Sequence, residues 1–266
     1  MKTITKLLQH SLLKILIAPL SLIIFGIISG SIVNQQVQWL SFIQLYLLVL
    51  INELVDHFLY IHFDVKNKQQ APMFIMYACE GIFIAIFIWI LMTQHLVIAL
   101  LILLAHLGKI LVYFPYSFSL SPYHFILKVF FNTIIWNCIA YFTQTYGIDV
   151  PFYISLIPII VYYFVTLAQE FLLKRYFIRK PSLTSKIPKR AITIILIIIA
   201  LIAAIYLSLP SQTFYLIQML MITILIFISV PIMVETHNHH QVQNKINYLS
   251  IAHLIFTLMY SLSYIY

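Results

Sequence analysis

Residues 191–209 read AITIILIIIALIAAIYLSL, nineteen consecutive residues without a charged side chain. A helix of this length spans roughly 28 Å, close to the ~30 Å hydrocarbon core of a bilayer. The whole chain has the same character, because 63% of its 266 residues are hydrophobic and 8% are charged, with a mean hydropathy of +1.02. Since a soluble domain carries about 25% charged residues, this composition excludes a soluble enzyme, a disordered chain and a collagen-like fibre. The sequence predicts an all-α integral membrane protein.

Eight further apolar runs of similar length lie along the chain, so we predict nine transmembrane helices in a single domain over residues 1–266. The nine expected spans are 11–33, 39–61, 73–92, 96–114, 123–144, 151–173, 191–209, 212–234 and 247–266. The first span lacks a clear cleavage site for a signal peptidase and is expected to remain in the protein as a helix.

All 15 Lys and Arg residues fall on one side of this arrangement. The opposite loops, which contain neither residue type, are 34–38, 93–95, 145–150 and 210–211. By the positive-inside rule we expect the N-terminus in the cytoplasm and the C-terminus outside, in a cell membrane. Three lysines at span ends, Lys14, Lys109 and Lys128, are expected to snorkel toward the basic side. The net charge of +8 therefore indicates contact with anionic membrane lipids and not with nucleic acid.

The second span ends in an acidic segment, NELVDHFLYIHFDVKNK, at residues 52–68. Asn52 and Asp56 are four residues apart and share one helix face, while Glu53 precedes Asp56 by three. A charged group at membrane depth costs about 2.5–3.5 kcal/mol and rarely persists without a partner or a cavity. Mg²⁺ prefers oxygen ligands and is usually bound by one or two carboxylates together with substrate phosphates. The segment predicts a site for Mg²⁺; the alternative is a polar helix end that meets water.

At these residues the chain resembles the UbiA superfamily of intramembrane prenyltransferases, whose nine helices carry two Asp-rich motifs at a cytoplasmic active site. The first family motif is N-D-x-x-D-x-x-x-D-x-x-N-K. The similar positions here, with about one extra helical turn between the aspartates, are Asn52, Glu53, Asp56, Asp64, Asn67 and Lys68. The resemblance implies that Asp56 and Asp64 are catalytic and bind Mg²⁺ together with Glu53. It also implies substrate binding by Asn52, Asn67 and Lys68.

Further segments resemble the menaquinone branch of this superfamily, the 1,4-dihydroxy-2-naphthoate polyprenyltransferases. These segments are residues 17–19 with Gly26 and Gly30, 112–117 with 121–123, and 141–147, so the resemblance covers about residues 8–260. It implies a polyprenyl diphosphate and an aromatic, quinone-precursor-like acceptor as substrates, with Tyr113 and Tyr116 near them. A composition rich in isoleucine, phenylalanine and tyrosine is compatible with an AT-rich bacterial genome.

The second family motif, N-x-x-x-D-x-x-x-D, loses its acids in this chain. Gln169, Leu173 and Phe177 stand at its three positions, and Glu170 is the acid that remains nearby. One magnesium ion is therefore expected instead of two, with cations from the following basic loop in place of the second. The substrate-binding residues expected here are Glu170, Lys174, Arg175 and Arg179.

Three functions are compatible with these features. The first is a divergent prenyltransferase. The second is a catalytically inactive relative that binds an isoprenoid lipid or has an accessory or immunity role, which the loss of acids at Leu173 and Phe177 favours. The third is a small transporter, which five glycines and the lack of a visible internal repeat disfavour.

Overall fold

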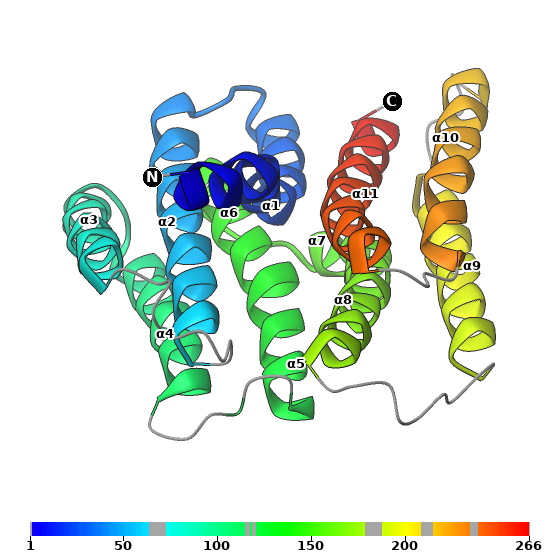
Figure 1. Cartoon of the computed structure of the whole chain (residues 1–266). Coiled ribbons are helices and arrows are strands. Elements are labelled where there is room, and N and C mark those ends of the chain that lie inside the picture. Colours follow the sequence, from blue (N-terminus) through cyan, green and yellow to red (C-terminus); the bar gives the residue numbers. More distant parts are fainter. Residues whose placement is uncertain are drawn as a thin grey trace. The chain divides into compact units, whose positions relative to one another are not determined.

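A computed structural model describes residues 2–63, 73–114, 118, 121–178, 188–208, 215–234 and 239–265, and every regular element in this part of the chain is a helix (Figure 1). The chain separates into two compact units, Met1–Tyr146 and Gly147–Tyr266. Each unit is described by itself below.

Eight helical stretches of the described chain are long and apolar enough to cross a bilayer. The expectation of an all-helical, multi-pass membrane protein is confirmed. The expected span at 212–234 is not among the eight: it corresponds to α10 (Tyr215–Met233), whose described apolar part, Gln218–Met233, is shorter. The structure therefore supports eight of the nine expected spans.

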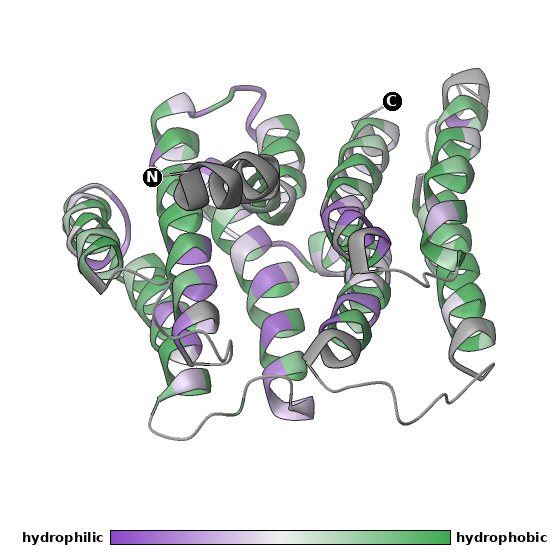
Figure 2. Cartoon of the chain, viewed as in Figure 1, coloured by the Kyte–Doolittle hydropathy of each residue, from purple (hydrophilic) through white to green (hydrophobic). Residues whose placement is uncertain are grey.

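The first unit is built around α2. Its elements are α1 (Lys2–Asn34), α2 (Trp39–Phe63), α3 (Met73–Thr93), α4 (Leu96–Tyr113), α5 (Pro122–Val129), the π-helix η2 (Phe130–Ile135) and α6 (Trp136–Thr145). The segments α5, η2 and α6 join into one candidate span, Pro122–Thr145. Helix α2 packs against α1, α3, α4 and α6. Most helix surfaces in this unit are hydrophobic, whereas hydrophilic residues gather on α2 and α5 (Figure 2).

Helices α1 and α6 make the most extensive helix–helix contact of the described chain. A Cβ added at Gly26 would lie 2.3 Å from the backbone oxygen of Asn137, and one at Gly30 would lie 2.7 Å from Cβ of Gln144. The backbone N–H of Gly26 also donates to Asn137 Oδ1 at 3.0 Å. Small residues allow membrane helices to approach this closely, so the two glycines fix how α1 packs on α6.

The second unit has an aromatic core. Its helices are α7 (Val150–Ser155), α8 (Ile157–Ile178), α9 (Pro188–Ser208), α10 and α11 (His239–Ile265). Tyr162 of α8 stacks on Phe256 of α11 with ring centroids 4.0 Å apart. One turn further along α11, the hydroxyl of Tyr260 donates to the backbone oxygen of Ser155 at 2.9 Å.

We expect Tyr260→Phe to lower the free energy of unfolding by about 1 kcal/mol, because it removes one buried hydrogen bond and keeps the ring. Unfolding can be followed by far-ultraviolet circular dichroism, which reports the helices of both units, during titration of mixed micelles with SDS. Tyr206→Phe is the matched control, since Tyr206 is 73% exposed, and it should leave stability unchanged. Equal losses in the two variants would contradict the role of the Tyr260 hydroxyl.

Candidate functional site

Two acids of α2 and two lysines, one from α4 and one from α5, form ion pairs inside the first unit. Lys109 Nζ lies 2.5 Å from Glu53 Oε1, and Lys128 Nζ lies 2.8 Å from Asp56 Oδ2. We call these four residues the charge cluster. All four lie within candidate membrane spans, and Asp56 and Lys109 are only 7% and 8% exposed. Each carboxylate at membrane depth thus has the cationic partner that such a group requires.

Local signals in the sequence set where α4 ends and α5 begins. Ser121 caps α5, since its Oγ accepts from the backbone N–H of His124 at 3.1 Å, and Pro122 occupies the first turn. Helix α4 stops where Phe114 becomes extended, as expected for a residue that precedes proline. Lys128 lies one turn beyond His124 on the same face of α5.

Hydrogen bonds complete the surroundings of both carboxylates. The Tyr113 hydroxyl donates to Asp56 Oδ1 at 3.0 Å, so a different partner contacts each oxygen of Asp56. Asn132 Nδ2 donates to Glu53 Oε1 at 3.5 Å. The charge cluster has two lysines and two acids, and its formal charge is zero.

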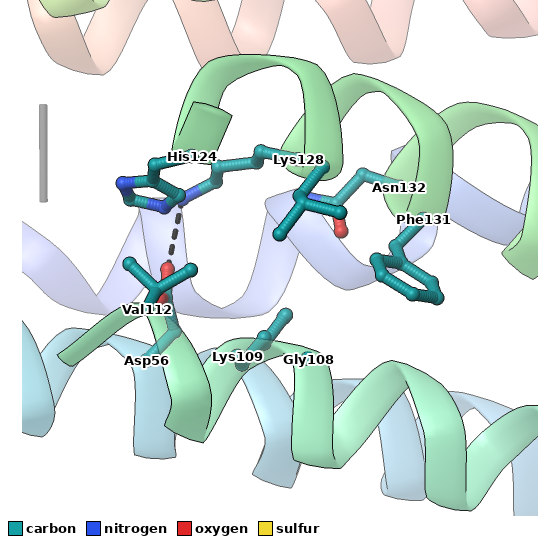
Figure 3. A pocket seen from close by; sticks show the side chains of 9 residues that line it. Asp56, Gly108, Lys109, Val112, His124, Lys128, Phe131 and Asn132 are labelled. Carbon is teal, nitrogen blue, oxygen red and sulfur yellow. Dashed lines mark hydrogen bonds and ion pairs between the residues drawn. The ribbon is translucent and has the colours of Figure 1, made fainter. Parts of the chain in front are cut away.

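A small pocket borders the charge cluster (Figure 3). Its polar wall consists of Asp56, Lys109, His124, Lys128 and Asn132, and its apolar wall includes Val112, Leu127 and Phe131. In Figure 3, Asp56 of α2 faces Lys128 of α5 across the pocket, with Lys109 of α4 beside it. Apolar walls with a few convergent polar groups are typical of ligand sites.

The π-helical turn η2 carries two of the lining residues, Phe131 and Asn132. Such turns are rare and are frequently found at functional sites. The sequence analysis missed this turn, because the run FFNTII fits a regular α-helix equally well. The turn follows directly after α5 and so places Asn132 near Glu53 while Lys128 contacts Asp56.

Asn52 takes part in a second polar contact between helices, outside the pocket. Its Oδ1 lies 3.0 Å from Nδ1 of His106 on α4, and Nε2 of His106 lies 3.0 Å from Glu80 Oε2 on α3. The ring of Phe83 stacks on His106 with centroids 3.7 Å apart. Asn52 is therefore engaged in packing α2 against α4 and α3 and does not line the pocket.

Among the site residues predicted from the sequence, the structure brings together Glu53, Asp56 and Tyr113. The predicted residues that lie outside the described part of the chain are Asp64, Asn67, Lys68, Tyr116 and Arg179. Arg175 belongs to α8, but its side chain is not among those described. Two predicted acids and one predicted tyrosine thus lie close together in the first unit.

Glu170 and Lys174, the other predicted residues, belong to α8 in the second unit. Their side chains form an ion pair of 2.9 Å between successive turns of this helix. Glu170 is therefore neutralised within its own helix.

The structure gives Lys109 and Lys128, which were expected to snorkel toward the basic side, carboxylate partners that the sequence analysis did not predict. Their ammonium groups lie against Glu53 and Asp56, and Lys109 is buried. A lysine snorkels when its charge has no partner at membrane depth, and here a carboxylate supplies one. These contacts could have been predicted from the sequence, because each acid inside a membrane span needs a cationic partner.

Glu53 and Asp56 offer the oxygen ligands that Mg²⁺ prefers, but each already has a lysine partner. Within the described ranges, no group of three or more His, Cys, Asp or Glu side chains could hold a metal ion. One or two protein carboxylates are enough where substrate phosphates supply further ligands. A magnesium ion at these two carboxylates would therefore need further oxygen ligands from a bound phosphate compound.

The charge cluster and its pocket are the strongest functional feature of the described residues. Ionisable residues inside membrane spans commonly mark substrate sites or ion pathways. The chain matches no family model, no curated protein and no solved structure, so a function must be argued from the chemistry of this cluster.

Proposed function

We propose that the chain is a divergent UbiA-type prenyltransferase, which moves a polyprenyl group from its diphosphate to an aromatic, quinone-precursor-like acceptor in the membrane. The observation that carries this proposal is the charge cluster beside a partly apolar pocket. Lysine ammonium groups bind phosphate oxygens, and carboxylates are the protein ligands of Mg²⁺. The resemblance of residues 52–68 to the first UbiA motif supports the same substrate class.

Binding of the substrate would exchange partners within the charge cluster. Lys109 and Lys128 would turn from the carboxylates to the phosphate oxygens. Glu53 and Asp56, with Asp64, would hold one magnesium ion that also contacts the diphosphate. A negatively charged diphosphate and a positively charged ion enter together, so every buried charge keeps a partner, as a site in low dielectric requires.

The chemistry follows from these roles. The bound magnesium ion supplies positive charge that stabilises the leaving diphosphate. Lys109 and Lys128 add charge of the same sign, which substitutes for a second metal. The allylic C–O bond breaks, a C–C bond forms to the acceptor ring, and the ring loses a proton to water. The residues of the first unit proposed to bind the substrates are Asn67, Lys68, Tyr113 and Tyr116.

We propose a UbiA-like bundle of nine helices in a bacterial cell membrane, with α10 as the remaining span. The N-terminus would be cytoplasmic and the C-terminus outside. The one-sided distribution of all 15 basic residues over the nine expected spans supports this orientation. A place in menaquinone synthesis follows from the branch that the sequence resembles.

The test is diphosphate release from a short polyprenyl diphosphate by the detergent-purified protein, with dihydroxynaphthoate or hydroxybenzoate as acceptor. We expect release that depends on Mg²⁺ and falls about 100-fold or more in Asp56→Asn, because one carboxylate ligand is lost. Asp149→Asn is the matched control, since asparagine serves equally well at the N-cap position of α7. Unchanged release in Asp56→Asn would contradict the proposed mechanism.

A second candidate function is binding of the lipid diphosphate without turnover. Leu173 and Phe177 replace the acids of the second motif, and Glu170 is paired with Lys174 at 2.9 Å. Saturable binding of a non-hydrolysable thiodiphosphate analogue, with no diphosphate released from the natural substrate on either acceptor, would favour this function over catalysis.

A further inference from the structure

The ring of His106 on α4 lies between an amide and a carboxyl group, and both present an oxygen to it. Nδ1 is 3.0 Å from Oδ1 of Asn52 on α2, and Nε2 is 3.0 Å from Oε2 of Glu80 on α3. Because an amide oxygen only accepts hydrogen bonds, Nδ1 carries a proton. The contact between Nε2 and Glu80 needs a second proton, on either partner. A neutral imidazole has only one N–H, so this pair holds one proton more than a neutral histidine beside a carboxylate.

The charges around this contact lead to the same proton count. Glu80 lies within the candidate span Phe74–Thr93, and among the described residues His106 is the one basic group that forms an ion pair with it. The two lysines of the charge cluster contact Glu53 and Asp56. An acid at membrane depth needs either a cationic partner or a proton of its own. Glu80 obtains either one only if the pair holds the additional proton.

The ring of Phe83 favours the arrangement in which His106 is the cation. Phe83 lies one turn beyond Glu80 on α3 and stacks on His106 with centroids 3.7 Å apart and an interplanar angle of 15°. Both rings are buried. The face of an aromatic ring carries negative charge and attracts a cation placed above it. Helix α3 thus offers a carboxylate to the edge of the imidazolium and an aromatic face to its plane.

We propose that His106 and Glu80 form a proton-binding site inside the membrane, and that the bound proton holds α2 and α3 against α4. Glu80 is the partly exposed end, where the proton enters and leaves. Its loss leaves a carboxylate beside a neutral ring. Asn52 Nδ2 receives no partner within the described ranges, so the amide would then turn to donate to Nδ1. The packing of three helices therefore depends on pH, independently of the proposed prenyl transfer.

The neighbouring titratable groups are already paired or neutral. On α2, Glu53 and Asp56 form ion pairs with lysines, one of which is Lys109 on α4 itself. On α3, the thiol of Cys79 is buried, and burial disfavours its charged form. The turn η2, which also packs on α4, carries no titratable side chain. The His106–Glu80 pair is thus the group of this region that is expected to change its charge near neutral pH.

The first test counts the protons of the pair in the folded protein at pH 8, where a solvated histidine is almost entirely neutral. Protein labelled with nitrogen-15 histidine is examined in micelles by NMR, and carboxylic acid bands are recorded by infrared spectroscopy. We expect one histidine with both ring nitrogens protonated, and its signal should be lost in Glu80→Gln. Glu170→Gln is the matched control, because Glu170 pairs with a lysine on another helix, and it should keep the signal.

The second test measures how unfolding depends on pH. A histidine in an unfolded chain releases its proton near pH 6.5. Above this pH the folded protein holds a proton that the unfolded chain lacks, so stability falls as the pH rises. From pH 7 to pH 8, the unfolding equilibrium constant of the wild type should rise about tenfold more than that of Glu80→Gln, whose neutral amide binds no proton. SDS titration followed by far-ultraviolet circular dichroism measures both proteins. Histidines elsewhere, such as His57 and His62 of α2, are common to both and cancel in this comparison.

A wild-type spectrum at pH 8 with neither an imidazolium signal nor a carboxylic acid band would overturn the proposal, and this measurement requires no variant to fold. An imidazolium signal that persists in Glu80→Gln would also overturn it, because the proton would belong to another histidine. So would an equal dependence of unfolding on pH in the wild type and in Glu80→Gln, since the proton would then contribute nothing to the packing of the three helices.

Discussion

Replacing Lys128 by methionine is expected to lower the free energy of unfolding by about 3–5 kcal/mol. Methionine keeps an unbranched apolar side chain but removes the ammonium group that lies 2.8 Å from Asp56 Oδ2. Asp56 would remain buried with the Tyr113 hydroxyl as a neutral donor, and one hydroxyl does not balance a buried carboxylate charge. SDS titration in mixed micelles, followed by far-ultraviolet circular dichroism, measures the loss in either unit.

The double variant Asp56→Leu with Lys128→Met should recover the stability that the single variant loses. Replacing both partners of a buried ion pair by apolar residues is often neutral, or stabilising by about 1–4 kcal/mol, because no uncompensated charge remains. The double variant should nevertheless release no diphosphate, since it has lost the proposed metal ligand. A stable but inactive double variant would thus separate the structural role of the pair from its functional role.

Lys174→Met is the matched control for this prediction. Lys174 pairs with Glu170 four residues earlier on α8, and both side chains lie near the end of a candidate span. Pairs of this kind contribute about 0.3–0.5 kcal/mol, so the control should cost little. A loss below about 1 kcal/mol in Lys128→Met would show that Asp56 reaches water or another cation, against the burial described here.

The membrane architecture could be predicted from the sequence because counting apolar runs requires no knowledge of tertiary contacts. The run expected at 96–114 is the helix Leu96–Tyr113, and the run expected at 123–144 lies within Pro122–Thr145. The run expected at 212–234 contains the 19-residue helix α10, and residues 212–214 of this run lie outside the described part of the chain.

Only the residues that α2 contributes to the site could be predicted from the spacing in the sequence. Helical periodicity correctly placed Asn52 and Asp56 on one face, but this face meets two different neighbours. Both residues contact α4, Asn52 through His106 and Asp56 through Tyr113, and Asp56 also pairs with Lys128 on α5. Spacing within one helix specifies the direction of a side chain and not its partner.

The partners of Glu53 and Asp56 are distant in the sequence, at separations of 56 and 72 residues. The sequence shows that two intramembrane acids need cations, and Lys109 and Lys128 were visible inside expected spans. Which acid pairs with which lysine depends on how α4 and α5 pack against α2. The residues of the π-turn η2 likewise show no pattern that distinguishes the turn from a regular α-helix.

The second large effect is expected from a single methyl group. Gly26→Ala should lower the free energy of unfolding by about 3 kcal/mol, at the upper end of the cost of overpacking. The new Cβ would lie 2.3 Å from the backbone oxygen of Asn137, and a backbone atom has no rotamer by which to move away. Helices α1 and α6 would have to separate, which would also weaken the bond from Gly26 N–H to Asn137 Oδ1.

Gly81→Ala provides the matched control, because a Cβ at Gly81 on α3 would meet no atom within 4 Å. Alanine is the better helix former, so this variant should be more stable by about 0.5–1 kcal/mol. The two substitutions are chemically identical, and helix propensity favours both equally. If Gly26→Ala lowers the free energy of unfolding and Gly81→Ala raises it, the difference reflects the close approach of α1 to α6. Similar changes in the two variants would show that the helices do not pack through Gly26.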